Sequence, residues 1–584
     1  MYKIRLRPLA AAIILSGCSS ATFAQLGQNL SVDIRSLSMG NAVTADPPGI
    51  SAIHFNPAAL TKIEGLQTDV QGILANFDIK REFSVPAGYN VFGYSDDPMV
   101  CNDGPEVSSD LCTDFKGTVN GDVEYVSLYV PILKKMVDLG EGIPMAAPTA
   151  GIAYKPPGSK MTFATAMYAP LVAGFGAENG NAGNYMGQQV ALERITYLSP
   201  SIAYEVNDAL SIGASVGMSY QAIGLKTDLR FPNELIGMLR MIDEVVCTPF
   251  KENQDIITDI LLLGMCNTEE GMNPFGRFGQ MQLALEQSLS PSYNLGVLWE
   301  PTEDFSFGMV YQSSAKMRLK GKYHIDNAKA PQELIKGLMS SPTGQILAAI
   351  LGFPSVVPAS ESGLVSMDFE YPAHFQAGVK YKVLPDLQVN FDVGWTDYKA
   401  WDKFKFEFDR QISALKIAKL LSANIGDTSL ALPLEFTSPW NFGIGMEYSA
   451  TDRLKLRAGY EPRTSAIPDN KRNTMVPINN AQLFGLGVGY RFDADTDVDL
   501  SIGFLRSKDK IPANSSSLAN QTGVNNILLN PYAGLNVKTD TKVTILGLNY
   551  RPSSKGSEMK ILQFAEKTQP KSIKDFAEER TEKL

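Results

Sequence analysis

Hydrophobic and polar residues alternate along many segments of this chain. From Leu387 to Trp395, leucine, valine, phenylalanine, valine and tryptophan occupy every second position, and polar residues or glycine lie between them. The same alternation runs through residues 440–448, 454–461 and 484–492. A period of two gives a β-strand one apolar face and one polar or small face. These segments approach the roughly 9–11 residues that a tilted strand needs to cross a bilayer.

Short polar turns and long loops follow one another between these segments. The short turns lie at residues 205–208, 300–304, 384–386, 450–452 and 493–497. Outer-membrane barrels have short periplasmic turns and longer extracellular loops, so this order predicts an all-β, antiparallel transmembrane β-barrel of about 14 strands. In an alternative count, residues 121–132 replace or extend the second strand. The expected strands cover residues 66–82, 147–156, 160–170, 189–204, 210–229, 289–299, 305–323, 365–382, 387–408, 439–449, 454–465, 481–492, 498–507 and 537–551.

Residues 1–24 are typical of a secretory signal peptide. Lys3, Arg5 and Arg7 precede a short apolar run, and the sequence ATFA at residues 21–24 fits cleavage after Ala24. The sequence LSGC at residues 15–18 also fits a lipoprotein site, so a lipid-anchored Cys18 stays open as an alternative. No run of about 18 apolar residues is present, so membrane-spanning helices are not expected.

Residues 63–551 are expected to form the barrel, and residues 25–62 are expected to form a hatch inside it. The segment is too rich in glycine, proline, asparagine and aspartate for a membrane strand, and its apolar residues favour burial in the lumen. Pro57 restricts Asn56 to an extended conformation, and Ala58 is small enough for close contact with a wall. We therefore expect this turn to act as a gate, the alternative being that it only starts the first strand.

The cysteines outside the signal peptide form two local pairs, Cys101 with Cys112 and Cys247 with Cys266. In an exported protein this spacing predicts two local disulfides, although other pairings are possible. Zinc binding is the alternative, but it needs tight cysteine spacing or nearby histidines. The three histidines of the chain do not provide them, and we expect neither a metal site nor a cofactor.

The charge of the chain argues against a nucleic-acid partner. Its formal net charge is −10, and lysine and arginine are scattered rather than clustered. The sequence GLGVG at residues 485–489 lacks the spacing of a dinucleotide-binding loop and lies inside a strand. No Ser–His–Asp arrangement follows from the spacing of the three histidines, so an enzyme is not expected.

Some of the long segments between strands are too apolar for ordinary loops. Residues 234–246, 256–265 and 333–351 have apolar residues at helical spacing. These helices either cap the barrel and bury their own apolar faces or form an exposed groove that captures a hydrophobic ligand. In the second interpretation the groove contains Leu235, Leu239, Ile335 and Leu338.

Residues 36–60, SLSMGNAVTADPPGISAIHFNPAAL, resemble the hatch of the FadL family of outer-membrane long-chain fatty-acid transporters, with Asn56, Pro57 and Ala58 at its Asn-Pro-Ala motif. Residues 311–323, 370–401 and 440–505 are also similar to that family, and the resemblance extends to about residue 551. It implies a fourteen-strand barrel plugged by the hatch. It further implies ligand capture between extracellular loops, a hydrophobic cavity, and exit through a gap in the barrel wall. The charged residues 552–584 depart from the family pattern and are expected in the periplasm as a tail.

The resemblance implies passive uptake of long-chain fatty acids or similar hydrophobic molecules by a monomer in outer-membrane lipid. A general porin and a structural or adhesive barrel are the alternatives. A fatty acid needs apolar walls and one cation for its carboxylate. Arg472 is the first candidate, because it lies in a segment that resembles the proline- and arginine-bearing loop of the family, and Arg463 and Arg318 are weaker candidates. For each of them, a solvated loop arginine is the alternative.

Overall fold

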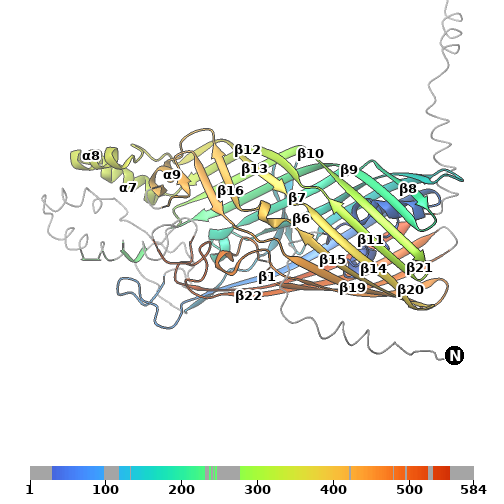
Figure 1. Cartoon of the computed structure of the whole chain (residues 1–584). Helices are drawn as coiled ribbons and strands as arrows, with labels where there is room; N and C mark the ends of the chain where they lie inside the picture. Colours follow the sequence, from blue (N-terminus) through green and yellow to red (C-terminus); the bar gives the residue numbers. More distant parts are fainter. Residues whose placement is uncertain are drawn as a thin grey trace, which may run out of the picture.

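The alternating segments form long antiparallel strands that close into one barrel, shown in Figure 1. The structure is a computed structural model that describes residues 29–97, 117–131, 133–230, 236–238, 241, 244–245, 277–419, 422–477, 479–492, 496–523 and 530–552. The first and last strands join in register, from Val70 with Tyr550 to Ser84 with Asn536. The predicted all-β transmembrane barrel is therefore confirmed.

The barrel wall has 14 strands, several of them made of two segments. In chain order they are β1 (Gly65–Ser84), β5 (Met145–Lys155), β6 (Met161–Gly176), β7 with β8 (Gln189–Leu198, Ser201–Asn207), β9 (Leu210–Leu229), β10 (Gly279–Thr302), β11 with β12 (Phe305–Gln312, Ala315–Asn327), β13 with β14 (Ser360–Tyr371, His374–Leu384), β15 with β16 (Leu387–Thr396, Lys403–Phe408), β19 (Trp440–Ser449), β20 (Leu454–Arg463), β21 (Ala481–Arg491), β22 (Asp497–Ile511) and β23 (Asn536–Arg551).

Proline explains two of the breaks in these strands. Pro200 separates β7 from β8, and Pro372 separates β13 from β14. Proline has no backbone N–H to donate to the strand ladder, so the pairing is interrupted where it occurs. The sequence GLGVG at residues 485–489 lies within β21, as expected, and forms no loop.

Residues 121–132 do not replace the second wall strand, which corrects that part of the alternative count; only residues 121–125 lie beyond its end between β1 and β6, where the N–H groups of Val123 and Glu124 donate to Ile79 and Gly176. The segment contributes to a hairpin of β3 (Tyr125–Val130) and β4 (Lys135–Glu141), which pair with each other. Among the described residues, the hairpin has one ladder pair with the wall, Tyr125 with Gly176 of β6, and the N–H of Tyr129 donates to the Glu193 side chain of β7. The rest of the hairpin packs against neighbouring wall strands. Its Tyr129 side chain lies in one hydrophobic cluster with Ala191 of β7 and Ala222 of β9. Short strands complete the sheet, namely β2 (Thr118–Asn120), β17 (Ile425–Gly426) and β18 (Ser429–Pro433).

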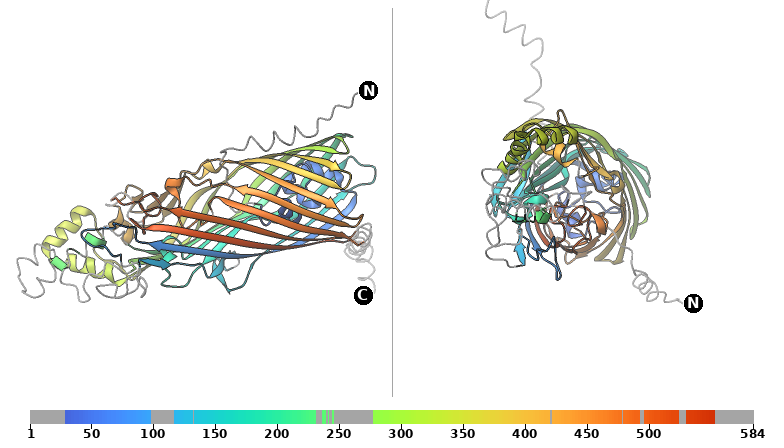
Figure 2. Two further views of the ribbon diagram at one scale, coloured as in Figure 1. Left: turned by 90° about the horizontal axis from the view of Figure 1, so that it is seen from below. Right: turned by 90° about the vertical axis from the view of Figure 1, so that its left-hand side faces the viewer.

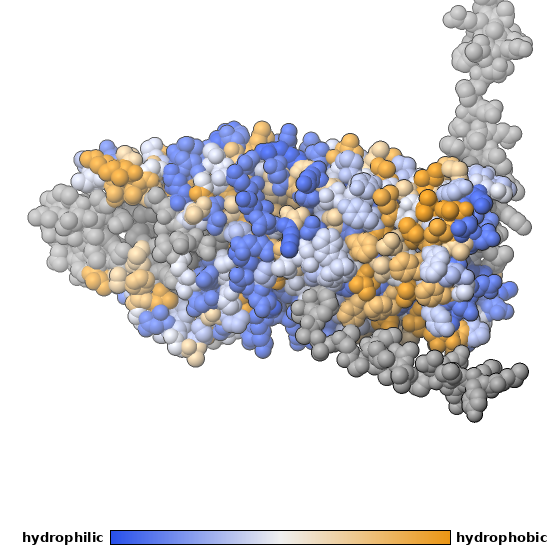
Figure 3. All heavy atoms as spheres, viewed as in Figure 1, coloured by the Kyte–Doolittle hydropathy of each residue, from blue (hydrophilic) through white to orange (hydrophobic). Residues whose placement is uncertain are grey.

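Exposed apolar side chains form a belt on the strands of the half of the barrel that carries the short turns, and Figure 3 shows one face of this belt. On β21 the belt consists of outward residues that are exposed, and it runs through Phe484, Leu486, Val488, Tyr490 and Phe492. A belt of this kind is the face that an outer-membrane barrel presents to lipid. Beyond the belt the outward residues become polar, as on β22 after Phe504, and the strands continue past the membrane toward the long loops.

The predicted hatch lies inside the barrel near the short turns, where Figure 2 shows it within the ring of strands. Its elements are α2 (Ile34–Ser38), η1 (Gly49–Ser51), α3 (Ala52–Phe55) and η2 (Pro57–Lys62). Inward-facing glycines of the wall let the hatch backbone approach closely. A methyl group on Gly485 would lie 2.1 Å from the carbonyl oxygen of Leu37, and one on Gly213 would lie 2.3 Å from the carbonyl carbon of Pro57.

The remaining helices belong to the loops. At the far end of the molecule, α7 (Lys329–Ser340) and α8 (Pro342–Leu351) form the helical pair predicted for residues 333–351. Among the described residues, no single helix is long and apolar enough to cross a membrane. The other short helices are η4 (Ala182–Met186), η6 (Tyr398–Ala400), α9 (Ser413–Ala418) and η7 (Asp469–Lys471).

Candidate ligand-binding site

An apolar cavity of about 230 Å³ lies inside the barrel beyond the hatch. On β9 the hatch contacts Gly213 near the short turn, whereas Ile223, Leu225 and Leu229 line the cavity nearer the extracellular end of that strand. The lining is almost entirely aliphatic and aromatic. Such a cavity favours a ligand that gains free energy when its hydrocarbon leaves water.

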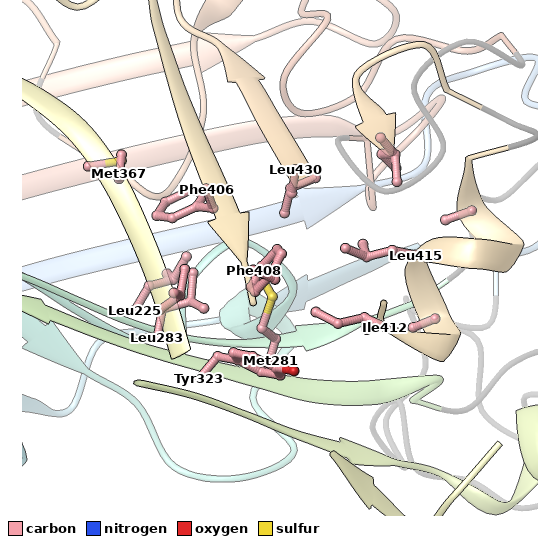
Figure 4. Packing of buried hydrophobic residues seen from close by; sticks show 14 of the residues in the cluster. Leu225, Met281, Leu283, Tyr323, Met367, Phe406, Phe408, Ile412, Leu415 and Leu430 are labelled. Atoms are coloured by element: carbon pink, nitrogen blue, oxygen red, sulfur yellow. The ribbon is translucent and has the colours of Figure 1, made fainter. Parts of the chain in front are cut away.

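Two groups of elements build the cavity. One side is the barrel wall, with Phe77 of β1, Leu171 of β6 and Leu192 of β7. The other side is formed by residues 401–436, which include β16 at the edge of the wall and β18, which pairs with it. Figure 4 shows this second group, in which Phe406 of β16 and Leu430 of β18 lie near Leu225 and Leu283 of the wall. The ladder between β16 and β18 pairs Phe406 with Leu430, and this pairing fixes both side chains on the same apolar face.

Two polar side chains lie next to the cavity on the inward face. Val190 and Leu192 line the cavity, and Arg194 is the next residue of β7 on that face. Arg194 is 1% exposed, lies 4.5 Å from the ring centre of Tyr371 and donates hydrogen bonds to Ser290 and Ser292. Among the described residues it has no ion-pair partner.

Gln221 of β9 pairs in register with Arg194. It is fully buried, and neither its amide oxygen nor its amide nitrogen has a hydrogen-bond partner among the described residues. A buried unsatisfied amide is costly, and a buried cation without a counter-charge is more so. The pair Arg194 and Gln221 is therefore suited to receive an anionic, hydrogen-bonding group at the hatch side of the cavity. Sequence reasoning missed this pair.

The three arginines proposed from the sequence lie elsewhere. The Arg472 side chain is held by Asp509 at 2.6 Å and also by Asp469, and Arg472 is not among the residues that line the cavity, although Asn473 is. Arg463 is buried and pairs with Glu461 at 3.0 Å. Arg318 is exposed on the outer face of β12 and pairs with acidic residues of neighbouring strands, which corrects its expected place near the lumen.

The predicted capture residues are only partly described. Leu235 and Leu239 lie outside the described residues. Ile335 and Leu338 of α7 are buried, at 1% and 5% exposure, and belong to the same hydrophobic cluster as the cavity wall. They pack inward because α7 lies on the loop end of that cluster, so they do not form an exposed groove. Ile346 and Ile350 of α8 are exposed instead, at 62% and 75%.

A gap in the strand ladder opens beside the cavity. β5 pairs with β1 only as far as Met145 with Ala75, and with β6 only as far as Ala150 with Met167. Beyond these pairs β1 and β6 have no common strand between them until residues 121–125, where the N–H of Val123 donates to Ile79 of β1 and the N–H of Glu124 donates to Gly176 of β6. Phe77, Val172 and Leu128 pack in the hydrophobic cluster at this place, so the edges of the gap are apolar. The hairpin of β3 and β4 lies against it.

The Asn-Pro-Ala turn anchors the hatch to the wall. The Asn56 amide donates to the carbonyl oxygens of Thr44 in the hatch and Val297 of β10, at 2.9 and 3.0 Å, and its oxygen accepts from the N–H of Ala58. A methyl group on Gly296 would lie 2.1 Å from the Asn56 oxygen. The turn is thus fully buried between the hatch and β10.

His54 of the hatch is buried and held by a hydrogen bond and by aromatic packing. Burial lowers the pKa of His54 to about 3, so the ring is neutral. It forms a 2.7 Å hydrogen bond with Asn29 and packs edge-on against Phe55 and Tyr168. Within the described ranges, no three His, Cys, Asp or Glu side chains are grouped to hold a metal.

Several predictions fall outside the described residues. They concern the signal peptide at residues 1–24, the tail beyond residue 552, the helix predicted for residues 256–265, and all four loop cysteines, Cys101, Cys112, Cys247 and Cys266. The two disulfides stay predictions.

Comparison with solved structures supports the same architecture. A Pseudomonas aeruginosa FadL homologue matches with a TM-score of 0.61 at 17% identity, covering 91% of this chain and all of that one. The Pseudomonas putida toluene transporter TodX matches with a TM-score of 0.54 at 15% identity, covering 91% of this chain and 99% of that one. At these identities the likeness concerns the fold.

Sequence relatives are distant. The 47 kDa outer membrane protein of Pasteurella multocida (strain Pm70) is 24% identical over 40% of this chain and 49% of its own length. The long-chain fatty acid transport protein of Escherichia coli (strain K12) is 20% identical over 56% of this chain and 63% of its own length. The matched segments thus span 49% and 63% of the length of these two relatives, which is less than two thirds in both cases. A family model described as outer membrane protein transport protein (OMPP1/FadL/TodX) matches residues 12–553, and the chain belongs to this family of outer-membrane transport proteins.

Proposed function

We propose that this protein admits long-chain fatty acids or similar apolar molecules across the outer membrane without an energy source. The observation that carries the proposal is the apolar cavity of about 230 Å³ enclosed in the barrel beyond the hatch. Relatives named as long-chain fatty acid transport protein and as toluene transporter point to the same class of ligand. The protein acts as a monomer, in contact with outer-membrane lipid through its apolar belt.

The proposed path begins at the long loops. The exposed Ile346 and Ile350 of α8 capture a hydrophobic molecule from the outside. The molecule then enters the cavity with its hydrocarbon tail among the aliphatic and aromatic walls. A carboxylate head group binds the Arg194 guanidinium and the Gln221 amide, and this step distinguishes a fatty acid from a plain hydrocarbon.

The proposed exit is the gap between β1 and β6. Its apolar edges suit lateral release of the ligand into lipid, and the hairpin of β3 and β4 has to move or yield for passage. The hatch occupies the lumen near the short turns, so its position favours lateral exit over passage straight through an aqueous pore, as in a porin. Asn56, Pro57 and Ala58 act as the gate in this proposal, since a ligand that binds better to a displaced turn shifts the hatch toward an open state.

The test places a charge in the cavity wall. Leu432, half-buried on β18, lines the cavity. We expect Leu432→Asp to weaken oleate binding by roughly ten-fold or more, because the ligand tail then desolvates a carboxylate. Leu432→Met keeps an apolar wall of similar volume and is the matched control, with little expected change. Binding is measured on purified protein with radiolabelled oleate, and uptake is measured in cells with and without the gene.

One outcome would contradict the assignment of the cavity as the ligand site. If Leu432→Asp assembles into a heat-modifiable barrel and still binds and admits oleate as Leu432→Met does, the cavity is not the ligand site. Native mass spectrometry of the detergent-extracted protein then identifies any molecule that is bound elsewhere.

A further inference from the structure

Three neighbouring wall strands change from an apolar to a charged outer face at one level of the barrel. β23 lies between β22 and β1, and Figure 2 shows these strands side by side, in red and blue. Ile502, Leu546 and Leu74 form one outward row of the belt across the three strands. The next row toward the long loops begins with Phe504 and is uncharged. It is the last row of the belt on this side.

Charged side chains fill the next three outward rows. From the belt toward the long loops, these rows consist of Arg506, Lys542 and Asp78, then Lys508, Asp540 and Lys80, and then Lys510, Lys538 and Glu82. They alternate with the inward residues of each strand, so they face away from the lumen. We call these nine residues the basic patch, because six of them are lysine or arginine. β22 runs from a short turn to a long loop, so the basic patch lies on the extracellular side of the belt.

The carboxylates of the basic patch do not balance its cations. Asp540 pairs with Lys508 and Arg506, Asp78 pairs with Lys542, and Glu82 pairs with Lys538. Lys80 and Lys510 have no ion-pair partner among the described residues. Asp122 adds a further carboxylate at the edge of the patch, since it accepts the N–H of Arg81 of β1. Even with Asp122 counted, the cations outnumber the carboxylates, so this face is positively charged.

The cations of the basic patch remain available to a ligand. Lys508 and Lys538 are more than half exposed although each has a carboxylate partner, and ion pairs at such a surface contribute little. Lysine and arginine donate charge-assisted hydrogen bonds to phosphate oxygens. A phosphate at the edge of the hydrocarbon layer is attracted more strongly than one in bulk water, because the dielectric constant is lower there. A basic cluster directly beside an apolar belt is therefore suited to an anionic lipid head group.

We propose that the basic patch binds a phosphorylated glycolipid of the outer leaflet, the chemical class of lipopolysaccharide. Its phosphates contact the lysines and Arg506, and its acyl chains lie against the belt at Leu546 and Leu74. Neighbouring strands lie about 4.8 Å apart, so β22 and β1 hold their cations roughly 10 Å apart. A sugar head group with two separated phosphates spans this distance, whereas a single phosphate does not. The basic patch lies outside the wall, so it does not depend on the proposed transport function.

The test measures lipid binding to the purified full-length protein in a non-ionic detergent. Fluorescent diphosphoryl lipid A, the phosphorylated anchor of lipopolysaccharide, is titrated with the protein. Unlabelled diphosphoryl lipid A, monophosphoryl lipid A and phosphatidylglycerol then compete for the site in separate arms. We expect saturable binding of diphosphoryl lipid A, with the other two lipids weaker by roughly ten-fold or more, because each of them has only one phosphate.

The variant removes the two lysines that have no ion-pair partner. Lys80→Gln combined with Lys510→Gln keeps both side chains long and polar and breaks no ion pair, so the barrel is expected to assemble. We expect this double variant to weaken binding of diphosphoryl lipid A by roughly ten-fold or more, since each lysine near a membrane surface adds to the attraction. If it does not assemble, Arg506→Gln combined with Lys508→Gln removes two other cations of the basic patch and is expected to give the same loss.

The matched control removes two lysines from another outer face on the same side of the belt. Lys320 and Lys322 of β12 are also exposed, but Glu286 pairs in register with Lys320, and acidic residues of neighbouring strands pair with Arg318 beside them. Lys320→Gln combined with Lys322→Gln is expected to bind diphosphoryl lipid A as the unaltered protein does. Equal losses in the two double variants overturn the proposal. It is also overturned if the unaltered protein shows no saturable binding or binds phosphatidylglycerol as tightly as diphosphoryl lipid A.

Discussion

At the level of single residues, the chemistry of the ligand head group depends on Arg194. We expect Arg194→Ala to weaken oleate binding by about 1.5–3 kcal/mol, the usual contribution of hydrogen bonds to charged groups. The methyl ester of oleate has no charge for the guanidinium to bind and is expected to lose little. Equilibrium binding of both ligands to the purified protein checks the prediction.

Arg472→Ala is the control for this prediction. Its side chain is held by Asp509 and Asp469 and does not line the cavity, so we expect nearly unchanged binding of both ligands. Equal losses for oleate and its ester in Arg194→Ala contradict the assignment and leave Arg194 a structural role beside Tyr371.

The sequence singled out Asn56 from its proline neighbour, and its gate role stays a prediction. In the structure the Asn56 amide donates to Thr44 of the hatch and to Val297 of β10, a partner that the sequence does not indicate. Arg194 carried a readable signal, since it continues the inward alternation of Val190 and Leu192, but the candidate arginines were taken from the segments that resemble the family. Gln221 could not be associated with Arg194 from the sequence, because the pairing of β7 with β9 brings them together only in three dimensions.

At the level of elements, the inward glycines decide whether the hatch can dock. We expect Gly485→Val to prevent close docking of the hatch, because the first added carbon alone lies 2.1 Å from the Leu37 carbonyl oxygen. The barrel itself is expected to assemble, since β21 keeps its ladder. Displacement is measured as faster proteolysis of the hatch and as greater entry of small hydrophilic antibiotics.

Gly72→Val is the matched control, because a methyl group on Gly72 meets nothing within 4 Å. Asn56→Ala, measured in the same assays, is expected to give a smaller effect, since it removes three hydrogen bonds and introduces no clash. An undisturbed hatch in Gly485→Val contradicts the docking role of the glycines. Normal uptake in Asn56→Ala with a loosened hatch argues for a passive plug instead of a gate.

Most strands were predictable because each follows from its own alternation. The breaks at Pro200 and Pro372 were not predicted, since the expected strands 189–204 and 365–382 run through them, although proline interrupts a ladder locally and the signal was present. The hairpin of β3 and β4 was not predicted either, because the partners of Tyr129 are Ala191 and Ala222 on the outside of the wall. Its packing depends on tertiary contacts that the alternation of residues 121–132 does not encode.

At the level of the whole molecule, the apolar belt fixes the depth of the barrel in the membrane. Val488 lies midway along the belt on β21, and Phe492 lies at its periplasmic end. We expect Val488→Arg to lower the free energy of unfolding in lipid by about 2–4 kcal/mol, and Phe492→Arg by about 0–1 kcal/mol. Urea unfolding in phospholipid vesicles, followed by tryptophan fluorescence, measures both. Equal costs at the two positions place the bilayer elsewhere on the barrel.

The pairing of β1 with β23 has a consequence for biogenesis. These strands come from opposite ends of the barrel sequence, so the ring cannot shut until the last strand has been delivered. The hatch contacts strands on both sides of this seam, with Ile34 against Gly547 and Ile50 against Gly151. A docked hatch therefore offers both sides of the seam one common surface, and we expect a chain that lacks the hatch to close more slowly.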